Sequence, residues 1–512
     1  MNWNILIQEW VLMPQMAKEV LTSPATLMGL LAGGALGLIG GILPGISAVM
    51  AMSLMLGFVF KLPVDAGLGL LVGIYCAAIY GGSVTAILLN IPGTPAAAAT
   101  VLDGHPMARA GKSREAIGIA TWSSFFGEIG GELGTFIFLP FIALVALRLG
   151  DWEIFLVSLI GLTLAGALGA KNPIKGWLSA FGGFLIAMIG TDPIWGIFRY
   201  GYTPELMRGI NFIPVLIGLF GLTEVIWVLR EKKPYVLTDT SGRMIAKLSV
   251  FKGFFKTIIR SILIGLGVGI VPGVGESVAP WLAYDAAKRN SKNSHLFGTG
   301  YPEGIIAPEV SNNATSGGAL IPMLVLGIPG SGPTAVILAS LFMYGIRPGP
   351  LLIVEQPGFI SKIIVLFWVS AVVFRLLSWI TSKWFIKLLS VRREIILPIA
   401  VCLGVIGAWG VGYTYFDIMT MFIFGIIGYF LRLREFPMAP MVLGVLVGGV
   451  ADYSLRRALI TYEGRIFEMF TRPFGIFLIA AFIIVLVGQF RNRIKDKKAE
   501  AAKANTIDHD VE

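Results

Sequence analysis

The segment Gly40-Gly41-Ile42-Leu43-Pro44-Gly45-Ile46-Ser47 interrupts an apolar stretch of the chain. A similar pattern returns in the second half as Gly267-Val268-Gly269-Ile270-Val271-Pro272-Gly273-Val274-Gly275. A proline removes a backbone donor and clashes with the preceding turn, and the glycine after it allows backbone angles that other residues avoid. Each segment therefore predicts a helix that is broken inside an apolar region.

A second pair of interruptions follows the first in the same order. Tyr80-Gly81-Gly82-Ser83 leads to Asn90-Ile91-Pro92-Gly93-Thr94, and Ser316-Gly317-Gly318-Ala319 leads to Gly327-Ile328-Pro329-Gly330-Ser331. Two ordered pairs at corresponding places predict an internal duplication. A single Pro-Gly is equally well a plain kink, but paired breaks favour a binding site, because lipid cannot satisfy the freed backbone groups.

The apolar regions around these breaks are long enough to span a bilayer. Of 512 residues, 56% are hydrophobic and 14% are charged, whereas a soluble domain carries about 25% charged residues. Long apolar blocks occupy residues 212–229, 359–380, 394–431 and 474–490. We therefore expect an all-α polytopic membrane protein with about 12 transmembrane segments. The segments should form two internal repeats, expected to be inverted, with Pro-Gly-broken or re-entrant helices.

The charge pattern divides the chain into four parts. Residues 1–230 form the first transmembrane repeat, 231–257 a basic central loop, 258–490 the second transmembrane repeat and 491–512 a charged soluble tail. The loop and the start of the tail are basic, and the positive-inside rule places both in the cytoplasm. Inverted halves with an odd number of crossings would place them on opposite faces, so the sequence leaves the orientation open.

Small polar residues surround the breaks in both repeats. Their hydroxyls, amides and freed carbonyls suit a small cation such as Na⁺, and the N-termini of half-helices suit a carboxylate. The alternative is that these residues only join helices by hydrogen bonds. The candidate substrate- and ion-binding residues are Pro44, Gly45, Ser47, Ser83, Thr85, Asn90, Pro92, Gly93, Thr94, Pro272, Gly273, Gly275, Glu276, Ser277, Asn312, Asn313, Thr315, Ser316, Gly317, Pro329, Gly330 and Ser331.

Acidic residues inside apolar stretches are costly and are therefore candidate functional groups. Glu128 and Glu132 share one helix face, and Glu303 and Glu309 flank the polar run of the second repeat. Glu276 follows a Pro-Gly break directly. It is therefore a candidate for cation attraction or proton transfer, with a salt bridge to a loop Lys or Arg as the equal alternative.

The sequence offers no set of residues that predicts catalysis. The three histidines are scattered, and we find no nucleophile–His–acid set, Walker A sequence or metal-ligand cluster. We therefore predict a transporter and not an enzyme or an ATP-driven pump, with no cofactor and with Na⁺ as a candidate coupling ion. A channel needs a continuous pore with a ring-like filter, which a two-repeat chain with broken helices fits poorly.

At its repeats the sequence resembles the large permease subunit of the tripartite tricarboxylate transporter (TctA) family. The matching segments are Leu43-Pro44-Gly45, the run from Tyr80 to Pro95, the break Val271-Pro272-Gly273-Val274-Gly275, and the run from Pro302 to Ser331. The resemblance covers nearly the whole chain. The combined motifs are specific, although any single Pro-Gly is not.

The resemblance implies a function and two partners. It implies a multi-pass subunit of the bacterial inner (cytoplasmic) membrane that takes up carboxylates, such as tricarboxylates, by symport with a cation, commonly sodium. It also implies a small membrane subunit and a periplasmic solute-binding protein as partners. A proton-coupled or binding-protein-independent organic anion carrier is the alternative.

Overall fold

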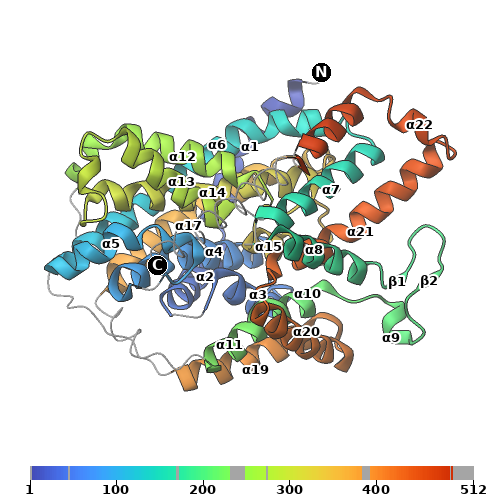
Figure 1. The fold of residues 1–512 in the computed structure, drawn as a ribbon, viewed down its shortest axis with the longest axis horizontal. Helices are drawn as coiled ribbons and strands as arrows, with labels where there is room; N and C mark the ends of the chain where they lie inside the picture. The colour runs from blue at the N-terminus through green and yellow to red at the C-terminus, as the bar shows by residue number, and fades with distance from the viewer. Residues whose placement is uncertain are drawn as a thin grey trace, which may run out of the picture.

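The computed structural model describes residues 3–43, 46–90, 92–168, 172–230, 248–272, 275–382, 393–484 and 486–487. The described chain is almost entirely helical, with a small antiparallel hairpin of β1 (Gly190–Thr191) and β2 (Phe198–Arg199). The predicted all-α class is therefore confirmed. Figure 1 shows this hairpin projecting from one edge of the helical body.

The helices of the first half are α1 (Trp3–Thr22), α2 (Pro24–Ile42), α3 (Ala48–Val59), α4 (Val64–Leu89), η1 (Pro95–Ala98), α5 (Val101–Met107), η2 (Ala108–Lys112), α6 (Ser113–Ala146), α7 (Asp151–Leu168), α8 (Pro173–Ala187), α9 (Pro204–Met207), α10 (Phe212–Leu216), η3 (Ile217–Leu222) and α11 (Thr223–Arg230). Those of the second half are η4 (Leu248–Gly253), α12 (Phe255–Gly269), α13 (Gly275–Asn290), η5 (Ser294–Leu296), α14 (Pro302–Leu326), α15 (Gly332–Met343), α16 (Leu352–Glu355), α17 (Phe359–Thr381), α19 (Arg393–Gly412), α20 (Tyr415–Leu433), α21 (Met438–Thr461) and α22 (Ile466–Met469).

Within the described residues, seven helices are long and apolar enough to cross a membrane. They are α2, α4, the continuous stretch Val101–Ala146, the stretch Phe212–Arg230, α17, α20 and α21. Four shorter apolar helices lie at Ala48–Val59, Gly332–Met343, Leu397–Gly412 and Pro473–Ile484. These helices make the chain a multi-pass membrane protein, and the count of about 12 crossings stays a prediction.

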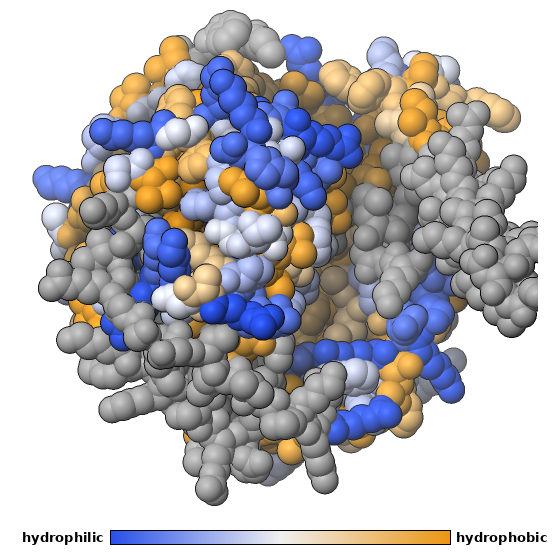
Figure 2. Space-filling view, turned by 60° about the vertical axis from the view of Figure 1, so that its left-hand side comes forward, coloured by the Kyte–Doolittle hydropathy of each residue, from blue (hydrophilic) through white to orange (hydrophobic). Residues whose placement is uncertain are grey.

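The outer surface has the mixed character of a membrane protein. Large apolar side chains such as Met28, Leu178 and Trp379 are exposed, where lipid would cover them. Polar side chains gather at the C-terminal end of α13, where Lys288, Arg289 and their neighbours are exposed. Figure 2 brings this side of the molecule forward and shows hydrophilic patches beside apolar ones.

The second break of each half has the same backbone design. α4 ends at Asn90 and α14 ends at Gly327, and both end residues have left-handed backbone angles, with φ of 58° and 69°. Such a residue stops a helix because it turns the chain away from the helix axis. In each half a Pro-Gly follows two residues later and a new helix, η1 or α15, begins shortly after it. The predicted breaks at these positions are confirmed.

Helices of one half pack against helices of the other in a reciprocal way. α6 of the first half contacts α12 and α14, and the equally placed α17 of the second half contacts α2 and α4. α7 and α8 pack on α21, whereas α19 and α20 pack on the stretch from α10 to α11. Figure 1 shows α12, α13 and α14 grouped beside α6. Each half therefore helps to cover central helices of the other half.

Glycines set a close helix contact between α2 and α4. A Cβ added at Gly29, Gly33, Gly37 or Gly41 would lie only 2.2–2.4 Å from a carbonyl oxygen of α4. These four residues are spaced by one helical turn and form one stripe, as in the small-residue interfaces of membrane helices. The contact holds α4, which is buried along almost its whole length, in a fixed position.

Candidate functional site

The breaks of both halves meet at one cavity of about 230 Å³. We call it the break cavity. It is smaller than the ~300–1,000 Å³ of sites for drug-sized ligands, and so suits a small organic molecule. Its polar wall consists of Ser47, Thr94, Glu276, Ser277 and Ser331. Its apolar wall includes Val49, Ile79, Phe220, Ala335, Val442 and Leu443.

Helix N-termini form much of this wall. The first residues of α3, η1, α13 and α15 all line the break cavity. Ser47 caps α3 by accepting a hydrogen bond from the Met50 backbone N–H at 3.1 Å. Ser331 caps α15 in a reciprocal capping box with Thr334. The starts of these helices carry partial positive charge, so the cavity is suited to an anion.

Glu276 brings a carboxylate into the same wall. The Tyr75 hydroxyl of α4 donates to Glu276 Oε1 at 2.7 Å and lies 3.2 Å from Ser331 Oγ. The sequence left a salt bridge to a loop Lys or Arg as the alternative for Glu276, and in the described structure its side chain instead accepts a hydrogen bond from this tyrosine. An anion entering the cavity would meet a like charge, unless a cation or a proton accompanied it.

Thr94 offers an unused hydroxyl to the cavity. Its side chain is buried, and Oγ1 has no hydrogen-bond partner within the described part of the chain. The preceding Gly93 N–H donates to the Gly82 carbonyl at 3.2 Å, and a Cβ at Gly93 would lie 2.6 Å from Thr85 Oγ1. The break is thus pressed against α4, which fixes the position of Thr94.

The predicted polar cluster of α14 lies in the helix interface and not on the cavity wall. Asn312, Asn313, Thr315 and Ser316 are fully or almost fully buried. The Thr315 hydroxyl donates to the Ser311 carbonyl at 2.8 Å, and Asn313 Nδ2 donates to the Glu309 carbonyl at 3.0 Å. Both polar atoms of the Asn312 amide lack a partner among the described residues.

The other predicted residues are spread around the breaks. Thr85 donates to the Gly82 carbonyl at 2.8 Å, and Asn90 and Pro92 are exposed. Gly275 lines the cavity, whereas Pro272 is not part of its lining. A Cβ at Gly317 would meet Gly131 of α6, and one at Gly330, which follows Pro329, would meet Ala319. Three predicted residues, Pro44, Gly45 and Gly273, lie outside the described residues.

A separate buried acid sits where α14 meets α4 and α6. The carboxylate of Glu309 accepts hydrogen bonds from Ser83 at 2.6 Å, from Ser124 at 3.0 Å and from the Thr100 hydroxyl. We call this group the Glu309 pocket. Ser83, a predicted site residue, therefore binds an acid of the other half and does not face the cavity.

The sequence matches the family model of the tripartite tricarboxylate transporter TctA family over residues 27–443. The chain belongs to this family. The matched range includes every residue that lines the break cavity, from Ser47 to Leu443. Membership in the TctA family implies the large subunit of a tricarboxylate transporter, in keeping with a transport protein and not an enzyme.

Two relatives from Agrobacterium vitis are similar to this TctA-family chain. An uncharacterized 52.8 kDa protein in the TAR-I ttuC' 3' region is 31% identical over 485 residues, which is 94% of this chain and 96% of the relative. An uncharacterized protein in the TAR-II ttuC' 3' region is 30% identical over 231 residues, which is 45% of this chain and 96% of the relative. No solved structure matches the chain.

Sequence reasoning missed several residues of the site in this TctA-family chain. Tyr75 is fully buried and bonds to Glu276, and Phe220 and Val442 line the cavity. Phe220 and Val442 lie in apolar helices where nothing distinguishes them from packing residues. The one available signal was Tyr75, because a tyrosine inside a long apolar helix needs a partner for its hydroxyl.

Proposed function

We propose that the chain takes up a small carboxylate, such as a tricarboxylate, through the break cavity by secondary transport. One observation carries this proposal: helix starts from both halves converge on one cavity that also contains Glu276. The helix starts favour the anion, and the glutamate favours a cation that travels with it. Na⁺ is the coupling ion that the family resemblance favours, with a proton as the alternative.

We further propose that the two halves are inverted repeats that rearrange around this cavity. The reciprocal packing of α6 and α17, and the matching ends of α4 and α14, support a duplication. A cavity between two such halves can open first to one side and then to the other, because one half can move as a body against the other.

The proposed setting is a tripartite system of the bacterial inner membrane. A periplasmic solute-binding protein would deliver the anion, and a small membrane subunit would complete the transporter. The TctA family membership supports these partners. A carrier that needs no binding protein is the alternative.

Uptake of radiolabelled citrate into proteoliposomes tests this proposal. The vesicles should contain the chain, the small subunit and the binding protein, with an inward gradient of Na⁺ or of protons. We expect accumulation with one of the gradients and none without the binding protein. Accumulation without the binding protein would reject the tripartite system and support the carrier that needs no binding protein. No gradient-driven uptake of citrate or of other carboxylates would contradict the proposed function.

The Thr94→Val variant tests the site itself. The hydroxyl has no protein partner among the described residues, so its loss should not change folding. A lost hydrogen bond to a charged ligand costs ~1.5–3 kcal/mol, so we expect the concentration for half-maximal uptake to rise about tenfold or more. The matched control is Thr163→Val, because Thr163 Oγ1 donates only to the Leu159 carbonyl of its own helix. Equal uptake in the two variants would remove Thr94 from the site.

A further inference from the structure

Two glutamates of α6, away from the break cavity, form a group that the transport site described above does not use. Glu128 and Glu132 are one helical turn apart, and both side chains are fully buried. We call them the glutamate pair. Ser316 Oγ of α14 lies 2.9 Å from Glu128 Oε1 and 3.5 Å from Glu132 Oε1. One hydroxyl therefore lies within reach of both carboxyl groups.

The glutamate pair has too few hydrogen-bond donors for two negative charges. Ser316 has a single hydroxyl hydrogen, and the Asn313 carbonyl also competes for it. The Cys76 thiol of α4 donates to Glu128 Oε1 at 3.3 Å, which is a weak bond. The Oε2 atoms of both glutamates have no partner within the described residues.

No positive charge in the described structure compensates the glutamate pair. The ion pairs of the described residues lie elsewhere in the chain. Arg375 of α17 stacks on Trp122, 4.4 Å from its ring centre. Arg260 of α12 donates to the Ala286 carbonyl. Two ionised carboxylates cannot remain together in a buried site without a compensating charge.

The acidic groups nearby would make this imbalance larger. Glu276 of α13 bonds to Tyr75, and the next residue, Cys76, bonds to Glu128, so a third acid is linked to the pair through α4. Glu309 lies about two turns before Ser316 on α14 and is already satisfied by three hydroxyl groups. Cys76 contributes its thiol hydrogen and no positive charge.

We propose that the glutamate pair holds one exchangeable proton, shared between the two carboxyl groups, and that this is a second cation site of the transporter. A proton needs only the two free Oε2 atoms, whereas a hard metal cation is bound by about six oxygen ligands. Two neighbouring acids that keep one proton between them carry only one negative charge, and the single Ser316 hydroxyl lies within 3.5 Å of both carboxyl groups.

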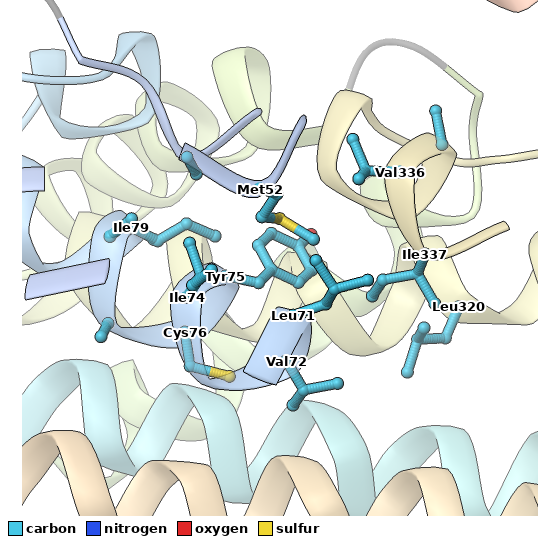
Figure 3. Close-up of a cluster of buried hydrophobic side chains, with 14 of the residues drawn as sticks. Met52, Leu71, Val72, Ile74, Tyr75, Cys76, Ile79, Leu320, Val336 and Ile337 are labelled. Carbon is cyan, nitrogen blue, oxygen red and sulfur yellow. The ribbon is translucent and has the colours of Figure 1, made fainter. Parts of the chain in front are cut away.

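The glutamate pair is linked to the break cavity through α4. Tyr75 donates to Glu276 at the cavity, and the next residue, Cys76, donates to Glu128. Figure 3 shows these two side chains leaving α4 in different directions, with the Tyr75 ring below Met52 and Cys76 turned toward the helices beneath. An anion in the cavity adds negative potential, which favours the proton on the pair, and the proton favours the anion in return. This link to transport rests on the proposed function; the proton itself does not.

Infrared spectroscopy of the purified full-length chain tests the proton directly, because a protonated carboxyl absorbs apart from a carboxylate. The test variant is Glu128→Gln/Glu132→Gln, and Glu309→Gln is the matched control. At neutral pH, the wild-type spectrum minus that of the test variant should contain one protonated carboxyl per chain and one carboxylate. The Glu309→Gln control should keep this signal. The signal should disappear as the pH rises, because the shared proton is then lost.

Three results would overturn the proposal. They are a difference spectrum with two carboxylates, one with two protonated carboxyls, or a protonated signal that Na⁺ removes at constant pH. The last result would make the pair a sodium site. The test needs no substrate and no partner subunit, so absence of citrate uptake would contradict the proposed function without touching this result.

Discussion

Two helix interfaces of this chain are built alike and contain different chemistry. The α2–α4 interface and the α6–α14 interface both bring backbones together through glycines, at Gly33 in the first and at Gly127 and Gly131 in the second. The α2–α4 glycine stripe faces the backbone of α4 from Ala66 to Ala78. The α6–α14 interface also encloses the glutamate pair, which Ser316 of α14 contacts. Close packing excludes water from both, so charge in the second needs a partner other than water.

The largest effect is expected from a substitution that disrupts the α2–α4 interface. In Gly33→Ala the new Cβ would lie 2.2 Å from the Leu70 carbonyl oxygen, so the helices must separate. We expect a loss of stability of about 3 kcal/mol or more, measured as thermal unfolding in detergent. Gly267→Ala is the control, because nothing lies within 4 Å of a Cβ there. Equal unfolding temperatures would show that α2 can move away without cost.

The next effect separates stability from function at the second interface. Glu128→Gln/Glu132→Gln removes buried charge and keeps the side-chain shape, so the unfolding temperature should stay the same or rise. Uptake driven by an ion gradient should fall by tenfold or more, because the variant cannot exchange the proposed proton. Both quantities should be measured on one preparation. If the variant unfolds at a lower temperature and still transports, the glutamate pair serves stability and not transport, which contradicts this prediction.

The smallest effect concerns the Glu309 pocket, which resembles the glutamate pair only in being buried and acidic. Ser83→Ala removes one of three hydroxyl donors to the carboxylate. A hydrogen bond to a charged group is worth ~1.5–3 kcal/mol, so we expect a decrease in unfolding free energy near the lower end of this range. The measurement is thermal unfolding. The control is Ser340→Ala, because the Ser340 hydroxyl donates to the Ile337 carbonyl of its own helix. A stability equal to that control would show that two donors suffice.

The comparison also shows how far the sequence could predict this structure. The breaks were predictable because Pro92 and Pro329 follow residues that end helices, and because the pattern occurs twice. The direction in which the side chains of α14 point could not be predicted from the sequence. Contacts with Gly127 and Gly131 fix the rotation of α14 about its axis. They place Ser316 in the interface with α6, and neither Asn312 nor Ser316 lines the cavity. Such contacts join residues far apart in the sequence, so no local pattern contains them.

The sequence could predict that residues after the breaks line a shared cavity, but it could not predict all the residues of the site. Ser47, Thr94, Glu276 and Ser331 follow breaks, and the structure brings them together as a repeat with broken helices suggests. Tyr75 comes from the middle of α4, far from the break at the end of that helix. Its role depends on the distance between α4 and the start of α13, which the sequence does not contain.

The reciprocal packing of the two halves also sets an order of events during synthesis. α6 enters the membrane with its glutamates, but the helix that covers them, α14, follows only later in the chain. At ~5–20 residues per second, the roughly 160 residues between the two helices take about 10 to 30 s to synthesise. During that interval the acidic face of α6 has no final partner. A nascent chain halted before α14 would therefore expose two acids inside the bilayer, which is the kind of defect that membrane quality control detects.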